Sequence, residues 1–100
     1  MAIEFQSRAV QVTEGSGNKR FEGPGTFSGT IRTAEAAIKD WNLFFLSGDH
    51  AIKGIGISTS IINTDGPFLN WRVECTLVDN QNNPPPYLGL ITILIIADIV

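Results

Sequence analysis

Apolar and polar residues alternate along much of the chain, and a period of two residues predicts β-strands. The clearest example is the segment FLNWRVECTLVD, residues 68–79. Its apolar positions form one face: Leu69, Trp71, Val73, Cys75 and Leu77. Because successive side chains of a strand point to opposite sides, this segment has one face suited to a core and one suited to water.

The same alternation predicts further strands, with small or polar residues between them. We expect strands at residues 3–13, 26–33, 41–47 and 50–62, with residues 33–40 forming a turn or the start of a strand. A change of phase near Ser7 and Arg8 indicates a β-bulge in the first strand.

Glycine, proline and asparagine mark the connections between these strands. Residues 14–25 carry four glycines and a proline, which predicts a long mobile loop. The pair Asp65–Gly66 predicts a tight turn, and residues 79–86 predict a second long loop. We therefore expect residues 1–100 to form a single all-β domain, an antiparallel β-sandwich of about six strands, with a small barrel as the alternative.

The closing segment YLGLITILIIADIV, residues 87–100, predicts a strand that is apolar on both faces. Its uncharged run is shorter than the roughly 20 apolar residues of a membrane helix, so we expect no membrane insertion. A sandwich buries one face of each sheet, and leaving Leu90, Leu94 and Ile96 in water would expose a contiguous patch. We expect a second copy of the chain to cover it. The alternative is that residues 34–40 or the glycine-rich loop fold over it, and the pattern leaves open which face points to the core.

Composition and charge exclude several kinds of partner. At 43% hydrophobic and 17% charged residues, the chain is globular rather than disordered. The net charge is −3 and the seven Lys and Arg residues are scattered, so we expect no nucleic-acid partner. Cys75 is the only cysteine, so no intrachain disulfide can form. No signal peptide is visible, and the location stays open between the cytoplasm and a released or virion-associated particle.

His50, the only histidine, has Asp49 beside it and is the first candidate for chemistry. Neighbouring side chains of an extended chain point apart, which favours a structural His50, with a ligand contact as the alternative. Without a second histidine, and with Cys75 facing the core, no zinc site is expected. Asp79 and the Asn residues after it offer oxygen ligands for calcium, but their spacing fits no EF-hand. We expect no metal, no cofactor and no enzyme activity, because no nucleophile–base pair or phosphate-binding loop is present.

Aromatic residues near loops are the remaining candidates for recognition. Trp71 is in phase with the core positions of its strand. Tyr87 follows three prolines at a loop–strand junction, where an exposed ring and nearby amides would suit a hydroxyl-rich ligand.

The order of these segments resembles that of the H-type lectins, as in small bacterial β-sandwiches akin to them. The resemblance covers about residues 36–99: WNLFFLSGDHAIKGIGIS, a turn, WRVECTLVD, a Pro/Asn loop and YLGLITILIIADI. It implies a six-stranded sandwich that assembles as a trimer or as a hexamer of two trimers. It also implies binding of N-acetylgalactosamine-like sugars at subunit junctions. The residue types that match the sugar contacts are Asp49, His50, Arg72 and Tyr87.

Two functions are consistent with these features. The first is a non-enzymatic homo-oligomer, a trimer or hexamer, that binds carbohydrate through loop residues near subunit junctions. The second is a structural self-assembling subunit without a small-molecule ligand, such as a phage capsid or tail decoration or a filament protein. The apolar last strand favours both equally.

Overall fold

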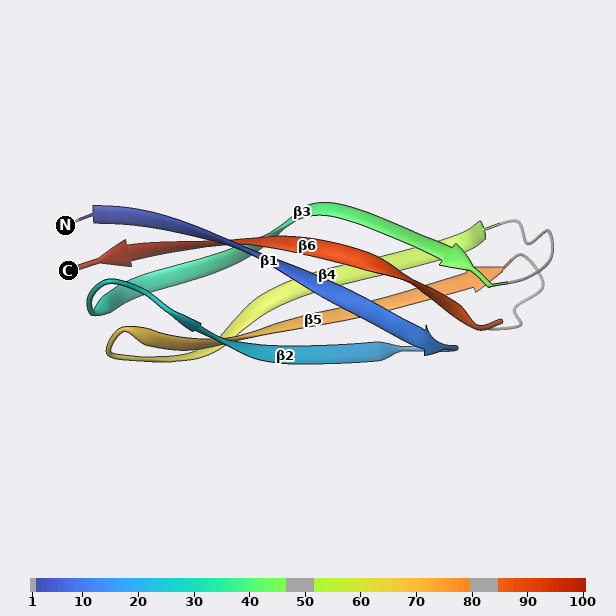
Figure 1. The fold of residues 1–100 in the computed structure, drawn as a ribbon, viewed down its shortest axis with the longest axis horizontal. Helices are drawn as coiled ribbons and strands as arrows, with labels where there is room; N and C mark the ends of the chain where they lie inside the picture. Colours follow the sequence, from blue (N-terminus) through green and yellow to red (C-terminus); the bar gives the residue numbers. More distant parts are fainter. Residues whose placement is uncertain (1, 47–51, 80–84) are drawn as a thin grey trace.

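The computed structural model describes residues 2–46, 52–79 and 85–100, and the regular structure of these residues is entirely β (Figure 1). The strands are β1 (Ala2–Gly15), β2 (Lys19–Thr26), β3 (Ile31–Phe45), β4 (Ile52–Asp65), β5 (Phe68–Asp79) and β6 (Tyr87–Ile99). They form two antiparallel three-stranded sheets, sheet A in the order β1–β6–β3 and sheet B in the order β2–β5–β4. The predicted antiparallel β-sandwich of about six strands is confirmed.

The sandwich is long and narrow, measuring 50 × 18 × 16 Å between its outermost Cα atoms. Figure 1 shows the strands running along the long axis, with the N- and C-termini at the same end. The central strands, β5 and β6, each have a hydrogen-bonded neighbour on both sides. Their inner faces therefore supply most of the core.

The core follows the alternation of the two central strands. All five apolar positions predicted for residues 68–79 are buried, which confirms that strand and its inner face. On β6 the inner residues are Tyr87, Ile91, Ile93, Ile95, Ala97 and Ile99. The structure thereby answers the question that the sequence left open about β6: Leu88, Leu90, Leu94 and Ile96 lie on the outer face.

The predicted β-bulge near Ser7 and Arg8 is wrong, because β1 pairs with β6 in continuous register from Ala2 to Val12. The first irregularity comes later, between Val12 and Gly15. The phase change instead marks a switch in which face of β1 is apolar. Val12 points into the core, whereas Ile3 and Phe5 lie on the outer face of sheet A.

The inward positions near the start of β1 are polar, and they close the side of the sandwich between β1 and β2. The Gln6 side-chain amide donates to the carbonyl oxygen of Thr26 at 2.5 Å. The Glu4 carboxylate accepts hydrogen bonds from the backbone N–H (3.1 Å) and the hydroxyl of Ser28. Charged and amide groups thus replace apolar ones where the two edge strands meet.

The predicted long loop over residues 14–25 is also wrong, since β2 occupies most of it. Two of its glycines lie opposite large core side chains of β5: Gly23 faces Trp71 and Gly25 faces Leu69. A Cβ atom at Gly23 would collide with the Trp71 indole. Pro24 is tolerated because β2 is an edge strand. The glycines are therefore packing residues of a strand rather than loop residues.

Residues 33–40, predicted as a turn or the start of a strand, lie in the middle of β3. This strand carries two irregularities, between Ile31 and Thr33 and between Ile38 and Asp40. The predicted turn at Asp65–Gly66 is confirmed as the β4–β5 hairpin, with Gly66 at a φ of +59°.

Candidate functional site

Of the four sequence-predicted site residues, Arg72 and Tyr87 lie in the described part of the chain, and the structure does not bring these two together. Asp49 and His50 lie outside the described residues, as do residues 80–83, which include the other candidate calcium ligands. Arg72 lies on the outer face of sheet B, whereas Tyr87 points into the core. The expected exposure of Tyr87 is wrong: its side chain is 0% exposed.

Tyr87 ties together three segments at one end of the sandwich. Its hydroxyl donates to the carbonyl oxygen of Gly17 at 2.8 Å, and the carbonyl oxygen of Cys75 is a second acceptor at 3.2 Å. Lys19 Nζ lies 3.9 Å from the centre of the ring and donates to the Tyr87 carbonyl oxygen at 2.9 Å. This cation–π contact and the hydrogen bonds make Tyr87 a structural anchor.

Cys75 is a poor nucleophile in this setting. Its Sγ lies 3.7 Å from the Tyr87 hydroxyl, and burial raises the pKa of the thiol above its ordinary value of 9.0. Burial also lowers the pKa of the Lys19 ammonium from 10.5. A reactive cysteine needs a lowered pKa and access to solvent, and Cys75 has neither.

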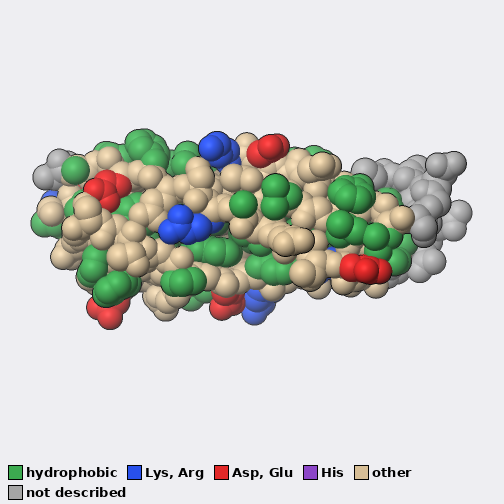
Figure 2. Space-filling view, viewed as in Figure 1, with side chains coloured by type: hydrophobic (Ala, Val, Ile, Leu, Met, Phe, Trp, Pro, Cys, Tyr) green, Lys and Arg blue, Asp and Glu red, His purple; other side chains and the backbone are tan. Residues whose placement is uncertain are grey.

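The outer face of sheet A is the most distinctive surface of the molecule. We call it the apolar face, and its apolar members are Ile3, Phe5, Ala9, Ala37, Phe44, Leu88, Leu90, Leu94 and Ile96. Phe5 is 62% exposed and Leu90 is 46% exposed. Leu94 and Ile96 are half-buried because β1 and β3 flank them. Figure 2 shows one side of the molecule, where hydrophobic side chains lie at many places along the described part, with charged groups between them.

Neither segment expected as an alternative cover for the apolar face lies over it. Residues 34–40 belong to β3 and lie in the same sheet, while residues 19–25 belong to β2 in sheet B. The described residues thus leave this face open to solvent.

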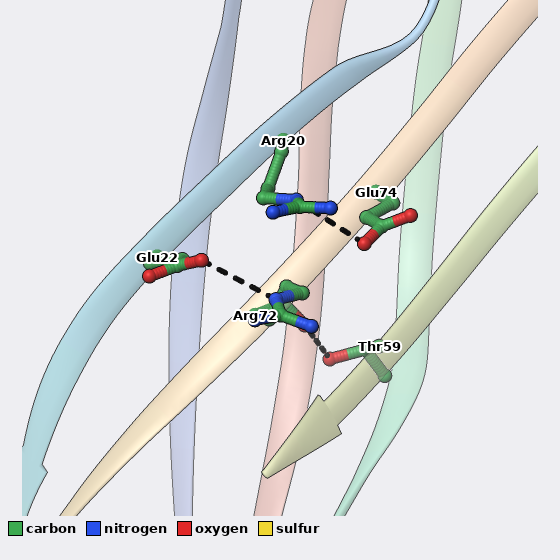
Figure 3. A network of polar contacts seen from close by, with 5 residues as sticks. All are labelled: Arg20, Glu22, Thr59, Arg72 and Glu74. Atoms are coloured by element: carbon green, nitrogen blue, oxygen red, sulfur yellow. Dashed lines mark hydrogen bonds and ion pairs between the residues drawn. The ribbon is translucent and has the colours of Figure 1, made fainter. Parts of the chain in front are cut away.

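The outer face of sheet B has the opposite character. Figure 3 shows Arg20 and Glu22 of β2 beside Glu74 and Arg72 of β5. Arg20 Nε lies 3.3 Å from Glu74 Oε1, and Arg72 Nε lies 3.3 Å from Glu22 Oε2. Further along, the Asn70 amide donates to Asn63 Oδ1 at 2.9 Å, and an exposed Phe68 ends the row. The two sheets therefore present one face suited to water and one suited to a partner.

A shallow hollow of about 300 Å³ lies on this polar face. Its lining is Asn18, Gly56, Ile57, Ser58, Glu74, Cys75 and Thr76. The amide, hydroxyl and carboxylate groups of this lining suit a polar ligand.

The charged groups of the apolar face lie mainly along β3, where Glu35, Lys39 and Asp40 are exposed, with Asp98 on the neighbouring strand β6. Lys39 donates to Ser7 Oγ at 3.2 Å, reaching across β6 from β3 to β1. Glu35 and Asp98 line a smaller hollow of about 150 Å³ together with Ile3, Thr33, Ala34 and Ile96. Asp98 Oδ1 is buried and has no hydrogen-bond partner among the described residues.

Sequence reasoning missed Glu35, Lys39 and Asp98 as functional candidates. The three alanines of residues 33–40 hid the alternation of β3, and no sequence signal shows that β3 and β1 flank β6. The charged Asp98 within an otherwise apolar strand was the one visible signal.

The described residues contain no group of three or more His, Cys, Asp or Glu side chains that could hold a metal ion. Over the same residues, no helix is long and apolar enough to cross a membrane. Comparison with known proteins finds no family model, no curated protein and no solved structure that matches this chain. The resemblance to the H-type lectins stays a prediction.

Proposed function

We propose that this protein is a non-enzymatic, self-associating structural subunit whose apolar face packs against the same face of a second copy. The observation that carries this proposal is the contrast between the two outer faces. Sheet B presents ion pairs to solvent, whereas sheet A presents Ile3, Phe5 and Leu90. Soluble monomers seldom expose large apolar patches.

The size of the apolar face supports a second copy as its partner. The Cα dimensions of 50 × 18 × 16 Å limit the whole long face, polar positions included, to roughly 800–900 Å², close to the roughly 800 Å² per partner of a standard interface. Pairing like faces is the commonest way in which soluble chains assemble. The trimer or hexamer implied by the lectin resemblance stays an alternative, and a hexamer would contain such pairs.

A structural role is supported by the chemistry of the described residues. Cys75 is buried with a raised pKa, and the ion pairs of sheet B join neighbouring strands rather than lining a deep cleft. A long and narrow sandwich with one apolar outer face suits a subunit of a capsid, tail or filament.

The test is a pair of lysine substitutions on the two central strands, followed by sedimentation velocity. Leu94→Lys puts a charge in the middle of the apolar face. We expect this variant to fold, and its dissociation constant for self-association to rise at least about tenfold. Thr76→Lys is the matched control, because Thr76 is half-buried on the outer face of the other central strand. Equal association of both variants would overturn the proposal. Unfolding of the Leu94 variant alone would show that this side chain stabilises the monomer core.

Carbohydrate binding is a second candidate, favoured by the hollow around Glu74, where polar groups lie beside apolar surface. Its groups suit a hydroxyl-rich ligand, and several copies in an oligomer would add avidity. The test is a glycan array probed with wild-type protein, Glu74→Ala and the loop variants Asp49→Ala and His50→Ala. Loss of binding in Glu74→Ala supports the hollow, and loss in the loop variants alone supports a loop site. No retention on any sugar removes this candidate.

A further inference from the structure

We infer that two copies pack their apolar faces about a two-fold axis perpendicular to the strands, so that Lys39 of each copy enters the Glu35–Asp98 hollow of the other. This inference rests on the proposed function and specifies the partner residues at the same face. It assigns a role to the charged side chains Glu35, Lys39 and Asp98 of the apolar face.

The residues that line the hollow include two carboxylates and no cation. Asp98 Oδ1 is buried without a partner among the described residues, and Glu35 lines the same hollow of about 150 Å³. Buried polar atoms of native proteins nearly always have a hydrogen-bond partner, and an unpartnered one is costly. An ammonium group that enters the hollow from outside the chain would make charge-assisted bonds to the carboxylate oxygens that line it.

Lys39 is the cation that an observed contact places on the apolar face. In the single chain its ammonium donates to the neutral hydroxyl of Ser7 at 3.2 Å, and the side chain is exposed. Exchanging this neutral acceptor for two carboxylates strengthens the hydrogen bonding. The exchange requires a second copy, because Lys39 and Glu35 lie four residues apart on one extended strand, roughly 13 Å in length.

The strand register makes this exchange geometrically consistent. Lys39 lies beside Thr92 and Ile93 of β6. Glu35 is paired with Ile96, and Asp98 follows two residues after Ile96 on the same face of β6. We place the two-fold axis in the interface, perpendicular to the strands and level with Ile95. This axis reverses the strand direction of the second copy and sets β3 of one copy over β3 of the other. Lys39 of one copy then faces the space between Glu35 and Asp98 of the other, while Asp40 beside it falls opposite Thr33. Both copies make the same contact, as an isologous interface requires.

The apolar residues fit the same axis. Leu94 of one copy falls against Ile96 of the other, close to the axis. On β1, Phe5 falls opposite Ser7 and Ile3 falls opposite Ala9, so that each large side chain meets a small one. Such interdigitation is what face-to-face sheet packing needs.

A two-fold axis parallel to the strands fits less well. It would set β1 of one copy above β3 of the other, with Phe5 against Glu35. It would also bring Asp98 against Asp98. Buried carboxylates against an aromatic ring or against each other are unfavourable.

The test uses Lys39→Glu, Glu35→Lys and their equimolar mixture, with self-association measured by sedimentation velocity. Each variant alone sets like charges against each other across the axis, so we expect its dissociation constant to rise about tenfold or more. In the mixture, the carboxylate introduced at position 39 of one copy meets the ammonium introduced at position 35 of the other, and the second contact keeps its native pair. We expect the mixture to associate nearly as tightly as wild type.

The control is Arg20→Glu, which changes the net charge by the same amount as Lys39→Glu but lies on the outer face of sheet B. It should associate like wild type. If the wild type associates but the mixture fails to restore association, or the Arg20 variant weakens it equally, the two-fold arrangement is wrong while the proposed function stands. A monomeric wild type would overturn both.

Discussion

At the scale of single residues, the Tyr87 hydroxyl joins β6 of sheet A to β5 of sheet B and to the turn between β1 and β2. The ring is fully buried and Lys19 lies over it. Burial raises the pKa of the Tyr87 hydroxyl above its ordinary value of 10, so the group stays a neutral donor at physiological pH. The single hydroxyl hydrogen is thus shared between carbonyl acceptors of two distant segments, with the shorter contact to Gly17.

Tyr87→Phe keeps the ring but removes the donor, leaving the Cys75 and Gly17 carbonyl oxygens without it. We expect the free energy of unfolding to fall by about 1–3 kcal/mol. The measurement is urea denaturation followed by fluorescence. Ser60→Ala, on the exposed outer face of β4, serves as the control and should change stability little. An unchanged stability of the Phe variant would contradict the anchoring role.

At the scale of the strands, Gly89 lets β6 and β3 approach closely near the start of β6. Gly89 has a φ of +156°, and a Cβ atom there would collide with the carbonyl oxygen of Asn42 on the neighbouring strand. The position therefore needs glycine for both its backbone angle and its space.

Gly89→Ala should cost about 2–4 kcal/mol through backbone strain and steric overlap. Gly54→Ala on β4 is the matched control, because a Cβ atom there would meet nothing within 4 Å. We expect that change to stay within about 1 kcal/mol. Urea denaturation of both variants gives the comparison. Equal effects would show that close approach at Gly89 does not constrain the β6–β3 pair.

The strands were predictable where apolar and polar residues alternate and the apolar residues all lie on the core face. Residues 68–79 alternate cleanly because one face of β5 is core and the other is solvated. In β2 the glycines that make room for Trp71 and Leu69 resemble loop residues, so the strand was missed. In β1 a switch of the apolar face looked like a bulge.

The candidate site was predictable only in part. The two apolar faces of β6 were visible from its sequence, and Tyr87 belonged by alternation to the same face as Ile91 and Ile93. The prolines before Tyr87 suggested exposure, and tertiary packing overrode that local signal. The Glu35–Asp98 hollow depends on which strands are neighbours, and a single sequence does not contain that information.

At the scale of the whole molecule, the two sheets differ in what they offer their surroundings. Sheet B exposes paired charges and amides, while sheet A exposes aliphatic and aromatic side chains on its outer face. A 100-residue chain buries only about two-thirds of its unfolded surface, so it gains from covering a further apolar face. Association of two copies would therefore add stability that depends on protein concentration.

The mass of the wild-type protein in solution tests this account most directly. Sedimentation equilibrium at micromolar concentrations should give at least twice the 10.9 kDa of the single chain. It should also show dissociation on dilution. A mass of 10.9 kDa throughout the micromolar range would contradict the account, because the apolar face of sheet A would then stay exposed without a partner.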